Sequence, residues 1–263
     1  MPTPNRPVSA EQGGPPAIAL RQVSKVYANG TVALQNLNVT VGESRFVSLL
    51  GPSGCGKSTV LKLISGLSPL SAGAIDWSGG LSARRLAYVF QDASLLPWLT
   101  VWENIRLPLK LAGLPHNVAN QRISEAIALV NLGGFERNYP RELSGGMKMR
   151  VSIARALVTQ PGLLLLDEPF GALDEITRSQ LNDELLKLWQ ERQWTVLFVT
   201  HSIYEAVYLS TQVVVMAAAP GRVVATVPIG EPYPRSQAFR ASPQYGAYCR
   251  QVSEQLYSAT LPR

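Results

Sequence analysis

A glycine-rich stretch constrains the fold more than any other part of this 263-residue chain. "GPSGCGKST", residues 51–59, directly follows the apolar run "FVSLL". Its spacing matches G-x-x-x-x-G-K-[S/T], the loop that binds nucleotide phosphates between a strand and a helix. Glycines let the backbone turn tightly and bring N–H groups close to an anion, and the following helix adds unpaired N–H groups. "STVLKLISG" supplies that helix, so we expect the chain to bind a nucleoside triphosphate.

Two side chains of this loop have the chemistry that a triphosphate requires. Lys57 can reach the β- and γ-phosphates, and the hydroxyl of Ser58 can ligate Mg²⁺. Cys55 is either a reactive thiol or a small residue that fits the loop, and both interpretations suit the sequence. The residues that we expect to bind the nucleotide here are Gly51, Pro52, Ser53, Gly54, Cys55, Gly56, Lys57, Ser58 and Thr59.

Composition narrows the classes of protein to which the chain can belong. The formal net charge is +6, but the basic residues are scattered, which favours a solvated surface over one that binds nucleic acid. No apolar run approaches the ~18 residues that a membrane-spanning helix needs. Residues 1–17 lack the apolar core of a signal peptide, and their Pro and Gly content predicts a flexible tail. The two cysteines offer no disulfide framework and suit a reducing cytoplasm.

Predicted strands and helices alternate along the chain, which indicates an α/β domain with a largely parallel core sheet. Residues 18–50 are expected to form strands, and "SAGAIDWSGG" a short hairpin. Residues from about 92 to 155 interrupt the alternation with helices, so we expect a helical subdomain inserted after the phosphate loop. "QVVVMAAAPGRVVATV" predicts two strands around a Pro-Gly turn. Residues 228–263 carry no motif and are expected to be a C-terminal tail that packs on the domain or contacts a partner.

The stretch "LLLLDEPFGALD" adds two acidic residues at a strand end. Four leucines predict a strand buried in a parallel sheet, and Asp167 and Glu168 follow at its carboxyl end, where ligands bind in such folds. Asp167 could hold Mg²⁺ through its water shell, and Glu168 could orient and deprotonate an attacking water. The alternative is an acidic strand end that contacts only solvent, and the phosphate loop makes this the less favoured interpretation.

"LSGGM" predicts a second place where an anion could bind. Ser144 is a good helix N-cap, and Gly145 and Gly146 leave N–H groups open to an anion. Standing alone, the stretch would be interpreted as an ordinary glycine-rich helix start.

In combination, these motifs resemble the ATP-binding subunit of ABC transporters over about residues 18–227. The family order is kept by "GPSGCGKST", "YVFQDASLLPW", "LSGGM", "LLLLDEP", "GALD" and "VTHS". The resemblance implies an ATPase that uses ATP and Mg²⁺. It also implies a phosphate-loop NTPase core with a largely parallel sheet, an antiparallel β-subdomain and an inserted α-helical subdomain.

The resemblance assigns roles to further residues. Tyr27 matches the aromatic residue that stacks on adenine, although an exposed strand-end tyrosine is the alternative. Gln91 matches the glutamine that touches Mg²⁺ or water and responds to the membrane subunit. His201 matches the histidine that contacts the γ-phosphate, and Asp174 the acid that crosses between two ATP sites. The catalytic residues are then Glu168, His201 and Gln91, and the metal ligands are Ser58, Gln91 and Asp167.

In the family, two subunits face each other head to tail. Ser144, Gly145 and Gly146 of one subunit then complete the ATP site at Lys57 of the other, and closure of this homodimer by ATP could drive a membrane partner. The chain departs from the family pattern at Met147, where glutamine is commoner, and at Gly171, where serine is commoner. Neither departure removes an anion-binding group or a carboxylate.

Longer stretches resemble one group within the family. "LLPWLTVWENI", "DEPFGALDEITR" and "APGRV" are similar to the nitrate, sulfonate and taurine importers. This implies a peripheral subunit on the cytoplasmic face of the (inner) membrane, which acts with separate permease subunits and a periplasmic or extracellular solute-binding protein. The expected solute is an aliphatic sulfonate such as taurine, or nitrate, with a thiamine-precursor pyrimidine or riboflavin as alternatives.

Two other functions stay open at this stage. A non-transport ABC ATPase of DNA maintenance or assembly would bind DNA tightly, but the scattered charge and the lack of a long coiled-coil insertion disfavour a nucleic-acid partner. An exporter subunit is the third possibility, and the importer-like motifs make it a minority interpretation.

Overall fold

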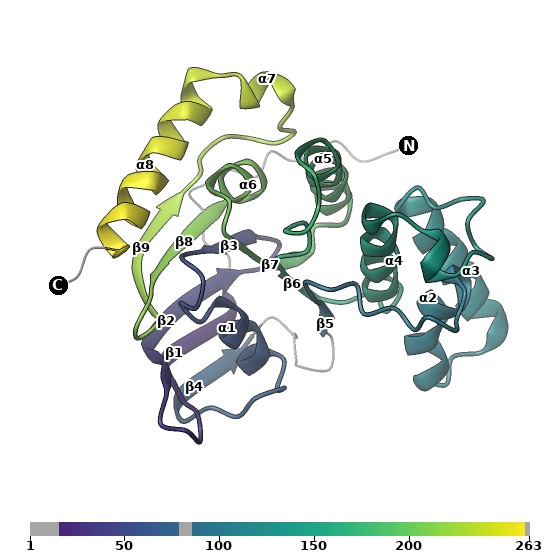
Figure 1. Cartoon of the computed structure of the whole chain (residues 1–263), viewed down its shortest axis with the longest axis horizontal. Helices are drawn as coiled ribbons and strands as arrows, with labels where there is room; N and C mark the ends of the chain where they lie inside the picture. The colour runs from purple at the N-terminus through teal and green to yellow at the C-terminus, as the bar shows by residue number, and fades with distance from the viewer. Residues whose placement is uncertain (1–15, 79–85, 261–263) are drawn as a thin grey trace. The chain divides into compact units, whose positions relative to one another are not determined.

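The computed structural model of the chain describes residues 16–78 and 86–260 (Figure 1). The chain divides into two units, one of residues 1–83 with 189–263 and the other of residues 84–188. In the first unit, an antiparallel sheet has the strand order β2-β1-β4, from strands β1 (Pro16–Val26), β2 (Val32–Gly42) and β4 (Ala72–Trp77). This sheet is the antiparallel β-subdomain that the resemblance implies.

The stretch predicted as a hairpin is instead one strand of this sheet. β4 pairs with β1 from Trp77 opposite Ile18 to Ala72 opposite Ser24. Gly73 has a φ of +88°, and a Cβ there would come within 2.5 Å of the carbonyl oxygen of Gln22, so the glycine permits close approach of two strands rather than a turn. Residues 79 and 80 of the predicted hairpin lie outside the described residues. The predicted tail 1–17 also lies outside them, except for Pro16 and Ala17, which begin β1.

The core of the first unit is a set of parallel strands. β3 (Phe46–Leu50) lies between β7 (Thr195–Thr200) and β8 (Gln212–Ala217) and runs parallel to both. Every residue of β3 and β7 is buried, as expected for parallel strands that are covered on both faces. β9 (Arg222–Pro228) returns antiparallel to β8, which confirms the two predicted strands around the Pro-Gly turn.

The helices of the first unit come after these strands along the chain. α1 (Lys57–Ile64) begins at the glycine-rich loop after β3, and α6 (Ile203–Leu209) follows β7. α7 (Gln237–Arg240) and α8 (Pro243–Thr260) come after β9, and α8 packs on α6, β8 and β9 (Figure 1). The segment that we named a C-terminal tail is therefore packed on the domain, which was one of its two expected states.

Arg235 anchors this C-terminal segment. Only 6% of the residue is exposed, and its guanidinium lies 4.1 Å from the ring centroid of Tyr233. Its nitrogens donate to five main-chain carbonyl groups, those of Val207, Tyr208, Ser210, Ile229 and Glu231. These bonds join the segment after β9 to the carboxyl end of α6.

The second unit contains the predicted helical subdomain. Strands β5 (Leu86–Val89) and β6 (Leu163–Asp167) are parallel to each other. The helices are α2 (Val101–Leu111), α3 (His116–Leu129), the 3₁₀ turn η2 (Pro140–Glu142), α4 (Gly145–Leu157) and α5 (Glu175–Arg192), the last of which ends in the first unit. Helices α2, α3 and α4 pack on one another. In the part of the chain that is described, no helix is both long and apolar enough to cross a bilayer.

Local hydrogen bonds define where the helices of this unit begin and end. Thr100 accepts from the N–H of Glu103, and the Glu103 side chain accepts from the N–H of Thr100, so the two residues form a capping box at the start of α2. α3 ends at Leu129 because Asn131 adopts a left-handed φ of 54° and Leu132 donates its N–H to the carbonyl of Ile127.

Candidate active site

The glycine-rich loop folds as a cradle around the ammonium group of Lys57. Lys57 Nζ donates to the carbonyl oxygens of Gly51 at 2.8 Å and Pro52 at 3.1 Å, and only 5% of the residue is exposed. No side chain caps α1, whose N-cap is Gly56 with a φ of 91°, so the first-turn N–H groups are not taken up by a capping side chain. A Cβ on Gly56 would come within 2.6 Å of Leu34. The loop therefore combines a buried cation with helix N–H groups, which suits a phosphate.

Tyr27 lies beside this loop, although the two are far apart in the sequence. Its hydroxyl is 3.2 Å from Oγ1 of Thr59, the third residue of α1. The residue is 39% exposed, and the Lys25 ammonium lies 5.2 Å from the ring centroid. An exposed aromatic ring next to a phosphate cradle is placed to stack on a nucleotide base.

His201 leaves the core strands at the same edge as the phosphate loop. Thr200 pairs with Leu50 in the parallel register of β7 and β3, so the residues that follow each of them emerge together. A local network fixes the turn that carries His201: the N–H of Ser202 donates to Thr200 Oγ1 at 3.0 Å, and Thr200 Oγ1 donates to the Glu205 carboxylate. Ser202 also caps α6. His201 itself is exposed.

In the second unit, Asp167 ends β6 and is almost fully buried, with 7% exposed. The hydroxyl of Tyr88 donates to Asp167 Oδ2 at 2.8 Å. Burial, and secondly the charge of Asp167, raise the pKa of Tyr88 well above its usual range, so the hydroxyl keeps its proton and acts as a donor.

Glu168, the proposed base, has an unusual backbone. Its φ of 45° lies in the left-handed region, which costs a non-glycine residue about 1–3 kcal/mol and is concentrated at functional sites. The carbonyl oxygen of Glu168 accepts from the N–H of Gly171 at 3.1 Å. Gln91 is exposed, and because Val89 pairs with Leu166 in the parallel register, Gln91 and Glu168 leave their strands at the same edge.

The "LSGGM" stretch begins α4, as predicted. Ser144 Oγ accepts from the N–H of Met147 at 3.3 Å, and Gly145 is the first helical residue. A Cβ on Gly146 would come within 2.9 Å of Thr177 Cγ2, so this glycine also allows α4 to approach α5. The stretch thus has a packing role as well as open N–H groups at a helix start.

Asp174 has a structural role that the sequence reasoning did not consider. Its Oδ1 accepts from the N–H of Thr177 at 3.0 Å, which makes it the cap of α5. Hydrogen bonding to Thr177 lowers the pKa of Asp174. Its side chain is exposed, so capping and a contact with a second subunit are compatible.

Three further residues make hydrogen bonds near the predicted site residues, and the sequence did not predict them. Tyr88 begins the stretch "YVFQDASLLPW", but a tyrosine within a strand does not by itself indicate a role in catalysis. Arg155 donates to the carbonyls of Ser94 at 2.9 Å and Ala93 at 2.8 Å, and so ties the segment after Gln91 to α4. Arg178 donates to the carbonyl of Leu173 at 2.7 Å. Arginines that bind main-chain carbonyls have no motif, because every sequence supplies carbonyls.

The predicted site residues fall into two sets, one in each unit. The first unit carries Tyr27, residues 51–59 and His201. The second carries Gln91, Ser144, Gly145, Gly146, Asp167, Glu168 and Asp174. Within residues 16–78 and 86–260, no group of three or more His, Cys, Asp or Glu could hold a metal ion. The expected ligands Ser58, Gln91 and Asp167 are all oxygen donors, which suit Mg²⁺ because this ion takes few protein ligands and keeps water and phosphate oxygens.

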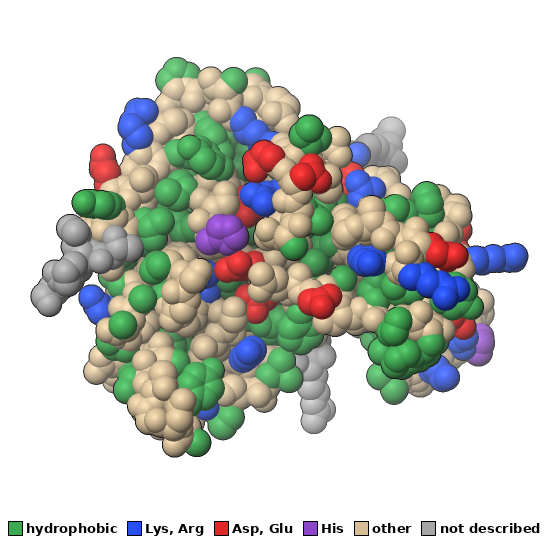
Figure 2. Space-filling model, in the orientation of Figure 1, with side chains coloured by type: hydrophobic (Ala, Val, Ile, Leu, Met, Phe, Trp, Pro, Cys, Tyr) green, Lys and Arg blue, Asp and Glu red, His purple; other side chains and the backbone are tan. Residues whose placement is uncertain are grey.

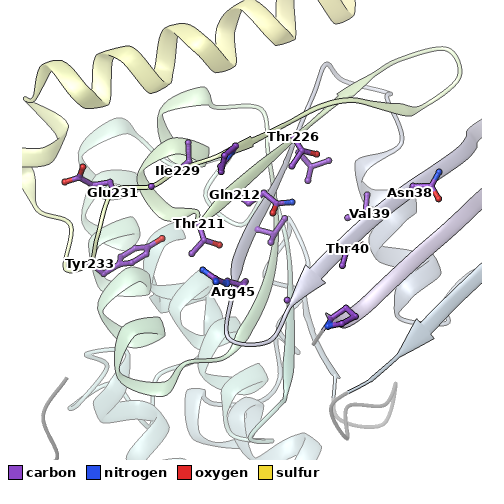
Figure 3. A pocket seen from close by; sticks show the side chains of 16 residues that line it. Asn38, Val39, Thr40, Arg45, Thr211, Gln212, Thr226, Ile229, Glu231 and Tyr233 are labelled. Carbon is purple, nitrogen blue, oxygen red and sulfur yellow. The ribbon is translucent and has the colours of Figure 1, made fainter. Parts of the chain in front are cut away.

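A cavity of about 530 Å³ in the first unit is distinct from this site. Figure 3 shows Arg45, Thr211 and Gln212 between the strand that carries Val39 and the segment that carries Tyr233. Arg45 precedes β3, whereas the phosphate loop follows it, so the cavity lies at the opposite end of that strand. None of the predicted site residues lines it.

Comparisons with known proteins agree with the motifs. A family model described as ABC transporter matches residues 34–171. The aliphatic sulfonates import ATP-binding protein SsuB of a Bacillus cereus strain is 45% identical over 226 residues, which cover 84% of this chain and 89% of that protein.

Solved structures show the same fold. A dimeric post-hydrolysis state of the ATP-binding cassette MJ0796, bound to ADP and Pi, has a TM-score of 0.71 at 32% identity and covers 81% of this chain and 98% of that one. CbiO1 from Clostridium perfringens, part of the ABC transporter complex cbiONQ, has a TM-score of 0.75 at 25% identity and covers 92% of this chain and 96% of that one.

Proposed function

This chain belongs to the ABC transporter family, and on that basis we propose that it is the ATP-hydrolysing subunit of a multi-subunit importer. The family, the ABC ATPase fold and the ATPase activity that the motifs predict are confirmed by the comparisons. The observation that carries the importer proposal is the 45% identity to a protein named for the import of aliphatic sulfonates.

The proposed reaction is in-line attack of water on the γ-phosphate of ATP. Lys57 and His201 neutralise the charge that develops on the phosphate oxygens. Glu168 positions and deprotonates the water, and Tyr27 holds the adenine. When bound by Ser58, Gln91 and Asp167, Mg²⁺ supplies further positive charge to the phosphates. The buried ammonium of Lys57 within its loop supports this assignment.

The proposed working form is a head-to-tail homodimer. Ser144, Gly145 and Gly146 of one subunit contact the ATP that is held at Lys57 of the other, and Asp174 crosses between the two sites. The open start of α4 supports this role, and a related cassette with ADP and Pi is dimeric. Closure on ATP and opening after hydrolysis would then move the membrane partner.

The proposed partners are permease subunits in the membrane and a solute-binding protein outside it, with this chain peripheral on the cytoplasmic face. We propose an aliphatic sulfonate, such as taurine, as the solute, ahead of nitrate, a thiamine-precursor pyrimidine or riboflavin. The name of the relative in Bacillus cereus favours this choice. On the face that Figure 2 draws, Lys and Arg lie among acidic, polar and apolar side chains, which does not favour a nucleic-acid partner on that face.

The test is purification of the tagged chain from gently solubilised membranes, with partners identified by mass spectrometry. We expect a multi-span permease and a solute-binding protein. The purified binding protein should then bind taurine or another alkanesulfonate more tightly than nitrate, riboflavin or a pyrimidine. A soluble complex or DNA in place of a permease would overturn the importer proposal and leave the ATPase assignment intact.

A further inference from the structure

The hydrogen bond between Tyr88 and Asp167 joins two neighbouring strands at the candidate active site. Tyr88 pairs with Leu165 in the parallel register of β5 and β6, so Asp167 lies two residues further along the partner strand. The Tyr88 side chain reaches along the strand direction, and its hydroxyl donates to Asp167 Oδ2 at 2.8 Å. Asp167 is 7% exposed, and the bond itself is partly buried.

The ring of Tyr88 contacts the residue that directly follows its strand. Phe90 stacks on it, with 4.2 Å between the ring centroids and 23° between the ring planes. Tyr88 and Phe90 also line a cavity of about 340 Å³ with Leu107, Pro108 and Leu111. The stacking contact supports the ring that carries the hydroxyl.

We propose that Tyr88 is a positioning residue for the magnesium ligand Asp167. This rests on the proposed function, in which Asp167 is that ligand. Carboxylates that bind metals are commonly held by outer hydrogen bonds, and the loss of such a partner lowers metal affinity or activity about 10–100-fold. The Tyr88 hydroxyl is such a partner: it orients the Asp167 carboxylate before the metal arrives.

The position of Tyr88 also relates this bond to Gln91. Both residues belong to the same segment, Tyr88 within β5 and Gln91 two residues after the strand ends. A displacement of this segment would therefore reach the Asp167 carboxylate directly through the hydroxyl. The hydrogen bond therefore connects Asp167 to the segment that carries Gln91.

The experiment compares Tyr88→Phe with the wild-type chain, because this change removes one hydroxyl and keeps the stacked ring. Binding of Mn²⁺ in the presence of a non-hydrolysable ATP analogue, followed by electron paramagnetic resonance, should weaken about 10-fold. The Mg²⁺ concentration for half-maximal ATPase activity should rise by a similar factor, while the KM for ATP at saturating Mg²⁺ changes much less. Tyr204→Phe, at a tyrosine that is 67% exposed on α6, is the matched control and should change neither value.

Asp167→Asn separates this proposal from the function on which it rests. If Tyr88 acts through Asp167, the double variant that combines Tyr88→Phe with Asp167→Asn should bind Mn²⁺ no more weakly than Asp167→Asn alone. Unchanged metal binding in Tyr88→Phe, with weakened binding in Asp167→Asn, would overturn the role of Tyr88 and leave that of Asp167. Unchanged metal binding in both variants would overturn the metal role of Asp167 and the role of Tyr88 with it.

Discussion

The guanidinium of Arg235 donates a 2.9 Å hydrogen bond to the main-chain carbonyl of Tyr208, near the end of α6. The same nitrogen donates to the carbonyls of Val207 and Ser210. The last carbonyls of a helix have no partner within the helix, and a cation is favourable there. Since α6 begins next to His201, the C-terminal segment stabilises an element of the candidate active site.

Replacing Arg235 with Met should lower the free energy of unfolding substantially. The change leaves buried carbonyl oxygens without donors, each of which costs about 1–3 kcal/mol, so we expect a loss of about 3 kcal/mol or more. Urea unfolding followed by circular dichroism measures it. Arg250→Met, at an exposed position on α8, is the control and should stay within about 0.5 kcal/mol of the wild type. Equal stability of the two variants would contradict the anchoring role.

Lys57→Ala should weaken ATP binding about 10- to 100-fold. A hydrogen bond to a charged group contributes about 1.5–3 kcal/mol, and each 1.4 kcal/mol is a factor of ten in affinity. Titration with a fluorescent ATP analogue gives the dissociation constant. Lys62→Ala, an exposed lysine on the same helix, should bind as the wild type does. A similar loss in both variants would indicate a general effect of charge rather than a phosphate contact.

Glu168→Gln should abolish turnover while ATP binding survives. The amide keeps the size of the side chain but cannot accept a proton from water, and general-base catalysis is worth about 10²–10⁴-fold. Steady-state ATPase assays and nucleotide titration on the same preparation separate the two effects. Glu191→Gln, exposed on α5, should hydrolyse ATP normally. Normal turnover in Glu168→Gln would show that another group activates the water.

Tyr27→Ala should weaken ATP binding roughly 10-fold, because stacking of a base on an aromatic ring is worth about 1–3 kcal/mol. Tyr27→Phe keeps the ring and loses only the contact with Thr59, so its affinity should match that of the wild type. Both variants are titrated with ATP and with inorganic triphosphate. Because inorganic triphosphate has no base, the comparison shows whether the lost affinity comes from the base or from the phosphates. Weaker triphosphate binding in Tyr27→Ala would point to a distorted loop instead of a lost base contact.

Asp174→Ala should lower the melting temperature at pH 7 because α5 loses its cap, whereas Asp174→Asn should retain most of the stability, since asparagine also caps helices. The folded-state pKa of Asp174 is lowered, so the charged cap stabilises the fold above the unfolded pKa of about 4 and this contribution is lost as the pH falls through the folded pKa. The difference in melting temperature between the wild type and Asp174→Ala should therefore become smaller below about pH 4. A gap that is constant with pH would show that the charge is not involved.

Sequence alone determined the parts of this protein that depend on neighbouring residues. The phosphate loop, the cap at Ser144 and the acidic end of β6 are all short-range patterns. Each is specified by side chains within a few positions of one another, because a helix cap or a turn needs only local geometry. The family followed from the order of these local motifs.

Tertiary structure decided the contacts that join distant segments. β4 pairs with β1 rather than with itself, Tyr88 contacts Asp167, and Arg235 fastens the C-terminal segment to α6. Strand pairing and guanidinium bonds to carbonyls use main-chain groups, which every residue carries, so they leave no pattern in the sequence. Side-chain identity therefore predicted the chemistry of the site, and only the folded backbone determined which distant groups support it.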